Sequence, residues 1–245
     1  MSLAKRPMQE LKVLSSDHKL KEIKEDNKMK TGITELVFIL DKSGSMAGLE
    51  DDTIGGFNAL LKKQQEESGE AVVTTVLFDD TYELLHDRIN IKGIKPITDK
   101  EYYVGGSTAL LDAIGKTIHK IGNVQKNTSE ELRADKVMFV ITTDGMENAS
   151  REYSNEKIKQ MVERQKEKYG WEFIFLGANI DAIATAQRFG IGKDRAVNFN
   201  ADEEGTTLNF KVISDTVSNF RVNCCIDENW KDSIEEDQRR RGRRR

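Results

Sequence analysis

The chain has 245 residues, of which 37% are apolar, 33% charged and 7% aromatic. Its net charge is −4, but six arginines lie in residues 239–245, and the other 32 basic and 42 acidic residues leave a net charge of −10. A body this acidic excludes a protein that coats nucleic acid with a basic surface, and leaves only a basic tail for such contacts.

Cysteine content and hydropathy favour an intracellular protein. Cys224 and Cys225 are adjacent, so no ordinary disulfide framework can be built from them. Neither a signal peptide nor a run of about 18 apolar residues is present. We therefore expect a cytoplasmic protein without membrane contact.

Three segments are expected along the chain. Residues 1–30 are polar and mixed in charge, and predict an N-terminal arm that is either a surface helix or disordered. Residues 31–222 contain the recurring apolar runs and are expected to form one domain. Residues 223–245 turn polar and end in arginines, which predicts a linker and tail without the means to form a core.

Apolar patterns within residues 31–222 predict alternating strands and helices. Strands are expected at residues 35–41, 71–78, 82–91, 136–143, 171–176 and 196–199. Helices are expected around residues 54–61, 111–121, 158–165, 180–189 and 210–220, the third capped by Ser154. The turn at residues 79–81 predicts a hairpin between the second and third strands. This order predicts an α/β fold: a doubly wound, mostly parallel sheet with helices on both faces and one antiparallel edge strand.

Three polar segments stand where strands should end. They are Asp41-Lys-Ser43-Gly-Ser45-Met46, Gly105-Gly-Ser-Thr108-Ala-Leu110 and Thr142-Thr-Asp144-Gly-Met-Glu-Asn148. Ligands of doubly wound sheets bind at the carboxyl ends of the strands, where the strand order reverses. If the chain starts at the sheet centre and later crosses back, Asp41 and Asp144 end neighbouring strands, and the Gly105–Gly106 turn can bring Thr108 close.

These side chains offer only hard oxygen donors. Two carboxylates and three hydroxyls favour Mg²⁺, with Mn²⁺ or Ca²⁺ as substitutes, and the absence of His and Cys disfavours zinc. Because neutral hydroxyls leave the cation incompletely neutralised, it keeps affinity for one more anionic oxygen. A carboxylate from a partner protein is the natural candidate.

Asp41-x-Ser43-x-Ser45, with Thr108 in a GGST loop and Asp144 in a TTDG turn, resembles the metal-ion-dependent adhesion site of von Willebrand factor A domains. The resemblance covers roughly residues 33–220. It implies a Rossmann-like sheet of about six strands with an edge hairpin. It also implies direct metal ligation by Ser43, Ser45 and Thr108, with Asp41 and Asp144 binding directly or through water. The motifs are more similar to those of intracellular bacterial and phage members than to those of adhesion receptors.

These observations predict a non-enzymatic protein-interaction module whose Mg²⁺ takes an Asp or Glu from a partner. One alternative is a Mg²⁺-dependent phosphohydrolase of the haloacid-dehalogenase type, whose first strand also ends in an aspartate. Such an enzyme needs a second aspartate two residues later, where this chain has Ser43.

A second alternative is nucleic-acid association through the tail. Its candidate residues are Arg239, Arg240, Arg241, Arg243, Arg244 and Arg245. Two readings stay open near the predicted metal site: Asn148 either braces the Asp144 turn or makes a plain Asx cap. Asp112 and the acids at 50–52 are more typical of helix N-terminal charges than of ligands.

Overall fold

The computed structural model describes residues 32–242. A six-stranded sheet lies at the centre, in the order β3-β2-β1-β4-β5-β6. Its strands are β1 (Thr34–Asp41), β2 (Ala71–Phe78), β3 (Tyr82–Asn90), β4 (Lys136–Thr143), β5 (Glu172–Gly177) and β6 (Ala196–Asn198). Each pairs in parallel except β2 with β3, which is antiparallel at the edge. The predicted α/β fold is confirmed, and the 1–30 arm lies outside the described residues.

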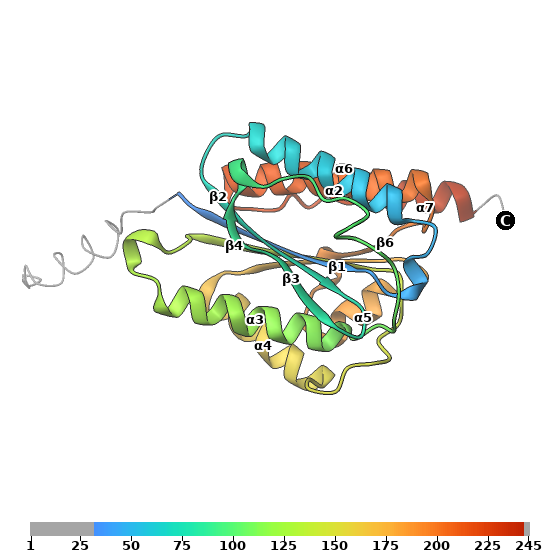
Figure 1. Ribbon diagram of the computed structural model, residues 1–245, viewed down its shortest axis with the longest axis horizontal. Coiled ribbons are helices and arrows are strands. Elements are labelled where there is room, and N and C mark those ends of the chain that lie inside the picture. Colours follow the sequence, from blue (N-terminus) through green and yellow to red (C-terminus); the bar gives the residue numbers. More distant parts are fainter. Residues whose placement is uncertain (1–31, 243–245) are drawn as a thin grey trace, which may run out of the picture. The chain divides into compact units, whose positions relative to one another are not determined.

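Helices cover both faces of this sheet (Figure 1). They are α2 (Glu50–Glu66), α3 (Leu110–Asn127), α4 (Asn155–Tyr169), α5 (Ala182–Arg188), α6 (Glu203–Asn223) and α7 (Asp232–Gly242). Helices α2, α6 and α7 pack on one face, while α3, α4 and α5 pack on the other. Ser154 caps α4 as predicted, since its side chain accepts a hydrogen bond from the Lys157 N–H.

Strand β1 explains why there are two cores. Every residue of β1 is buried, and successive side chains of a strand point to opposite faces. Leu36 and Phe38 therefore pack with α2 and α6, whereas Val37 and Ile39 pack with α3 and α4. A continuous apolar run is the expected pattern of a central strand that has helices on both sides.

The strand order creates the switch point on which the site prediction rests. From β1 the chain runs outward through β2 to β3, then crosses back to place β4 on the other side of β1. β1 and β4 run parallel in a register that pairs Leu40 with Thr142. Asp41 and Asp144 therefore leave the same end of the sheet from neighbouring strands, as the sequence predicts.

The chain after residue 222 differs from the expected polar linker and tail. Ile226, Trp230 and Ile234 belong to the hydrophobic core, with exposures of 6%, 8% and 2%. The Trp230 indole also donates a 2.8 Å hydrogen bond to the Asp194 carbonyl. Ile226 and Trp230 anchor the segment before α7 (Asp232–Gly242), and Ile234 anchors the helix itself, although the mean composition of residues 223–245 is polar. Among the described residues, no helix has the length and apolar character needed to cross a membrane.

We expect Ile234→Ala to lower the free energy of unfolding by about 2–4 kcal/mol, because a buried isoleucine would leave a cavity. Urea denaturation of the full chain measures this. Leu132→Ala, at a side chain 64% exposed, is the control and should change stability by less than about 0.5 kcal/mol. An equally small effect at Ile234 would show that α7 is not part of the cooperative core.

Candidate metal site

The three predicted hydroxyls meet at the carboxyl end of the sheet. A 3₁₀ turn over Gly44–Met46 follows β1 and brings Ser45 back toward Ser43. The Ser43 Oγ lies 3.1 Å from the Ser45 Oγ and 3.0 Å from the Thr108 Oγ1. Ser43 and Thr108 are 65 residues apart in the chain, so this contact depends on the fold.

The glycine turn places Thr108 as expected. The Gly44 N–H donates to the Gly106 carbonyl at 3.1 Å, and the Gly105 N–H donates to the Lys42 carbonyl at 2.9 Å. Gly106 has φ +70°, and a Cβ there would lie 2.6 Å from an Asp80 carboxylate oxygen. The positive φ favours glycine at this position, and a larger residue would also displace the Asp80 carboxylate.

The two carboxylates are buried in different ways. Asp41 accepts a 2.7 Å hydrogen bond from the Ser43 N–H through Oδ1, and one from the Thr143 hydroxyl through Oδ2. Asp144 is 3% exposed, and neither of its oxygens makes a hydrogen bond of ordinary geometry with a described residue. An unpartnered buried carboxylate is costly unless a cation or donor faces it.

Burial changes the acidity of both groups. Burial raises the pKa of Asp41 to about 6; hydrogen bonds from Ser43 and Thr143 oppose this rise, and the charge of Asp144 adds to it. Burial likewise raises the pKa of Asp144, against a smaller effect of the Ser45 hydroxyl. Without a ligand, the ionised forms of both carboxylates are therefore disfavoured. A divalent cation bound between them would stabilise these two negative charges.

Gly145 marks the centre of the hydroxyl cluster. A Cβ built on it would lie 2.8 Å from the Ser45 Oγ, 2.9 Å from the Thr108 Oγ1 and 3.7 Å from the Ser43 Oγ. Three hydroxyl oxygens thus surround a space beside the Asp144 turn. Their number, their hardness and the two adjacent carboxylates fit Mg²⁺ or Mn²⁺. Among residues 32–242, no group of three His, Cys, Asp or Glu side chains could hold a metal, so a zinc-type cluster is absent there.

Asn148 braces the site, but through Thr108 rather than through its own turn. Its side-chain oxygen accepts a 2.9 Å hydrogen bond from the Thr108 N–H, and its own N–H donates to the Thr108 carbonyl at 3.0 Å. The loop after β4 is thereby tied to the GGST loop. Asp112 is no ligand: its carboxylate accepts hydrogen bonds from the N–H groups of residues 151–153.

Lys42, inside the first motif, was not assigned a role by sequence reasoning. Its side chain is 2% exposed, its Nζ lies 2.9 Å from a Glu83 oxygen, and it lies 4.2 Å from the centre of the Tyr103 ring. Burial lowers its pKa, but the hydrogen bond and charge of Glu83 outweigh this and leave the pKa raised. Lys42 therefore ties the metal-site loop to the hairpin, away from the hydroxyls.

Two further residues that hold Asp41 in place were not predicted from the sequence. The Tyr102 hydroxyl, on a buried ring, donates to the Asp41 carbonyl at 2.6 Å. Thr143, within the TTDG turn, has no role predicted from the sequence, yet its hydroxyl donates a hydrogen bond to Asp41. Thr143 is the last residue of β4, which pairs with β1. The register of these two strands could therefore have predicted that its side chain lies beside Asp41.

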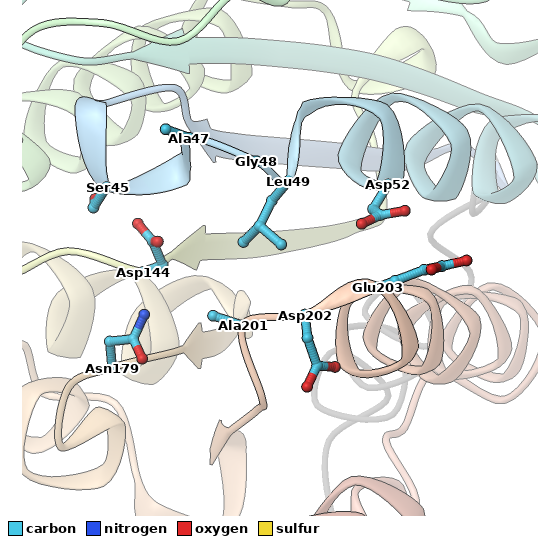
Figure 2. Close-up of a pocket in the computed structure, with 10 residues that line it drawn as sticks. All are labelled: Ser45, Ala47, Gly48, Leu49, Asp52, Asp144, Asn179, Ala201, Asp202 and Glu203. Atoms are coloured by element: carbon cyan, nitrogen blue, oxygen red, sulfur yellow. The ribbon is translucent and has the colours of Figure 1, made fainter.

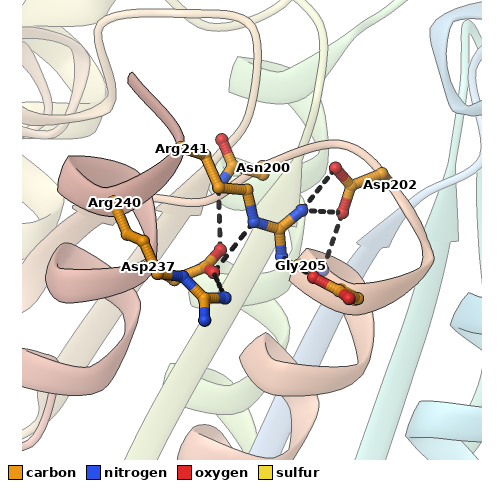
Figure 3. Close-up of polar contacts among 7 residues, drawn as sticks. Asn200, Asp202, Gly205, Asp237, Arg240 and Arg241 are labelled. Carbon is orange, nitrogen blue, oxygen red and sulfur yellow. Dashed lines mark hydrogen bonds and ion pairs between the residues drawn. The ribbon is translucent and has the colours of Figure 1, made fainter. Parts of the chain in front are cut away.

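The six arginines of the tail fall into three sets. Arg240 and Arg241 both contact Asp237, and Arg241 also pairs with Asp202 and Glu204. Figure 3 shows this network between α7 and the start of α6. Arg239 lies on α7, where no ion pair with a described residue involves it. Arg243, Arg244 and Arg245 lie outside the described residues.

Similarity to known proteins is found in the structure and not in the sequence. No family model matches the sequence, and no curated protein matches it either. Among solved structures, a von Willebrand factor type A protein from Catenulispora acidiphila aligns over 76% of this chain, with a TM-score of 0.52 and 12% identity. The fold is that of a von Willebrand factor A domain.

Two further structures with this fold contain metals. Proximal thread matrix protein 1 from the mussel byssus, "with zinc occupied MIDAS motif", aligns over 77% of this chain at a TM-score of 0.50 and 12% identity. Manganese-loaded Plasmodium vivax TRAP protein aligns over 73% at a TM-score of 0.50 and 16% identity. The chain spans 42% of the Catenulispora protein, 47% of the byssus protein and 72% of TRAP. At these identities the von Willebrand factor A likeness establishes the fold.

Gly145→Ala should weaken Mg²⁺ binding by at least about 10-fold, because its methyl group would displace the Ser45 and Thr108 hydroxyls. Isothermal titration calorimetry with Mg²⁺ and Mn²⁺ measures this. Gly55→Ala is the matched control, since nothing lies within 4 Å of its added methyl group. Unchanged affinity in Gly145→Ala would show that the three hydroxyls do not hold the ion.

Asn148→Ala should weaken Mg²⁺ binding by about 10-fold through loss of the brace on Thr108. The same titration tests it. Asn90→Ala removes a similar side-chain acceptor, from the Lys92 N–H, at a remote turn and should leave the affinity unchanged. Equal affinities for the two variants would remove Asn148 from the site.

Proposed function

We propose that the chain is a protein-interaction module that binds a partner through a divalent cation, most simply Mg²⁺. Asp41, Ser43, Ser45, Thr108 and Asp144 hold the ion, directly or through water, and the ion completes its coordination with an Asp or Glu of the partner. The unpartnered, buried carboxylate of Asp144 beside the hydroxyl cluster is the main support for this proposal.

The donor set explains why a partner carboxylate is needed. Two carboxylates bring two negative charges, but Asp41 is already engaged with the Ser43 N–H and the Thr143 hydroxyl. The hydroxyls contribute no charge, and the five donors leave a position of an octahedral Mg²⁺ open for a carboxylate oxygen of the partner. The zinc and manganese in two proteins of the same fold, named above, are consistent with a divalent cation here.

We also propose that the chain is not an enzyme. The phosphohydrolase alternative needs an acid–base aspartate at position 43, where the Ser43 hydroxyl instead contacts two other hydroxyls. His86, one of three histidines, bonds to Thr75 on the edge hairpin and takes no part in the site. Nucleic-acid association through the tail has less support from the structure than from the sequence, because Arg240 and Arg241 form ion pairs with Asp237.

Capture of partners on the immobilised full chain tests the proposal. Proteins retained in Mg²⁺ should be released by EDTA and recovered when Mg²⁺ is restored, because the ion bridges the two proteins. Asp41→Ala should abolish retention to the same extent, and Asp41→Asn keeps the size of the side chain in case the alanine variant is unstable. Asp99→Ala, at an exposed aspartate outside the site, is the control. A complex that survives both EDTA and the Asp41 variants would contradict the proposal.

A further inference from the structure

The two ends of helix α6 carry different chemistry. Its start borders the candidate metal site, where a pocket of about 550 Å³ is lined by Ser45, Asp52, Asp144, Asp202 and Glu203 (Figure 2). At its other end, Cys224 and Cys225 follow directly after the last helical residue. Because α6 has 21 residues, it is about 30 Å long, and the cysteines lie far from this pocket. They are the two cysteines of the chain, and the proposed function does not use them.

The turn after α6 presents both thiols to solvent from an anchored backbone. Both cysteines are free and exposed. Phe220 before the turn and Ile226 after it are buried in the core, with exposures of 3% and 6%. The Asn219 side-chain amide also donates a 3.0 Å hydrogen bond to the Asp227 carboxylate across the turn. The thiols are therefore held close to each other on a fixed part of the surface, which lowers the entropic cost of binding one ligand with both.

The backbone conformation does not hold the two thiols apart. Successive side chains point to opposite sides of an extended strand. Cys224 instead caps the end of α6 with φ 58° and ψ 16°, which is a left-handed, turning conformation. Since both side chains are exposed, packing does not fix their rotamers either. Both sulfurs can therefore turn toward one bound atom.

An internal disulfide between these neighbours is disfavoured. The peptide bond that joins them is trans, which places their Cα atoms about 3.8 Å apart. Disulfides usually join Cα atoms about 4.4–6.8 Å apart, so a bond at this spacing is strained and easily reduced. An ion that bridges the two sulfurs enlarges the ring and avoids this strain. The pair is therefore better suited to chelate a thiophilic ion than to oxidise.

The number of ligands decides the class of ion. Thiolates are soft ligands that favour Cu(I) or Zn²⁺ over Mg²⁺. Structural Zn²⁺ sites use four protein ligands. Among residues 32–242, no group of three His, Cys, Asp or Glu side chains could hold a metal. Cu(I), in contrast, forms stable complexes with two thiolates, which is what this turn offers.

We infer that Cys224 and Cys225 form a two-thiolate site for one Cu(I) ion. The thiols lose their protons as the ion binds, and no electron is transferred, so affinity rises with pH. The site does not depend on the proposed function, because its sulfur ligands stand at the opposite end of α6 from the oxygen ligands of the candidate Mg²⁺ site. Hard and soft ions therefore do not compete for the same ligands.

Anaerobic titration of the reduced full chain with Cu(I), against a coloured Cu(I) chelator, tests the inference. One ion should bind per chain. Cys224→Ser and Cys225→Ser should each weaken binding by at least about 100-fold, since the chelate loses one of its two ligands. Cys224→Gly suits the positive φ and serves as a second variant if the serine variant is unstable. Met146→Leu removes a thioether that is 74% exposed elsewhere and should leave the affinity unchanged.

Native mass spectrometry of the same samples gives the outcomes that would overturn the inference. Full affinity in either single-cysteine variant would show that the two thiols do not act together. An ion shared between two chains, or Zn²⁺ bound as tightly as Cu(I), would exclude the two-thiolate site. A Cys224–Cys225 disulfide that persists in reduced glutathione would show that the pair is oxidised instead.

Mg²⁺ titration separates this inference from the proposed function. Asp41→Asn should lose Mg²⁺ and keep Cu(I), whereas the cysteine variants should lose Cu(I) and keep Mg²⁺. Failure of the unmodified chain to bind Mg²⁺ would overturn the proposed function and leave this inference standing. Failure to bind Cu(I) would do the reverse.

Discussion

Two carboxylates buried at the ends of adjacent parallel strands are the constraint on which this site depends. A doubly wound sheet brings Asp41 and Asp144 together because β1 and β4 are neighbours that leave the sheet in the same direction. Asp41 accepts two hydrogen bonds, whereas Asp144 accepts none of ordinary geometry from a residue that the structure describes. A buried carboxylate without a partner costs stability in the protein alone, and the cation proposed above would offset that cost.

The loops around the strand ends make that arrangement specific. Hydroxyls contributed by segments 65 residues apart lie within hydrogen-bond distance because backbone bonds through Gly44, Gly105 and Asn148 hold three loops together. These bonds are made by main-chain groups or by one amide side chain. None of these groups ionises, so the bonds do not depend on the protonation of Asp41 or Asp144. The loops that carry the candidate ligands are therefore held by contacts other than those that the proposed ion would make.

Sequence reasoning recovered the strands, the switch point and the hydroxyl cluster, because each depends on local patterns or on strand order. Ser43 and Ser45 follow a buried strand, and Asp144 follows its neighbour, so their meeting needs only the topology. The supports were less accessible: Tyr102 reaches the Asp41 carbonyl from an irregular segment with no periodic pattern. Helix α7 was missed because its buried apolar residue, Ile234, stands among charged residues, and the other two core residues, Ile226 and Trp230, precede the helix. The pocket acids depend on how two helix starts face each other across space, which no spacing in the chain reports.

Helix α7 has a consequence for how other chains can approach the sheet. The Lys231 ammonium just before it donates a 2.9 Å hydrogen bond to the carbonyl of Ala196, the first residue of edge strand β6. At the opposite edge, β3 has two register shifts against β2, and Arg88 on it has a φ of 51°. Short, capped or distorted edges are poor templates for intermolecular strand pairing. Both edges of the sheet therefore resist aggregation by strand addition.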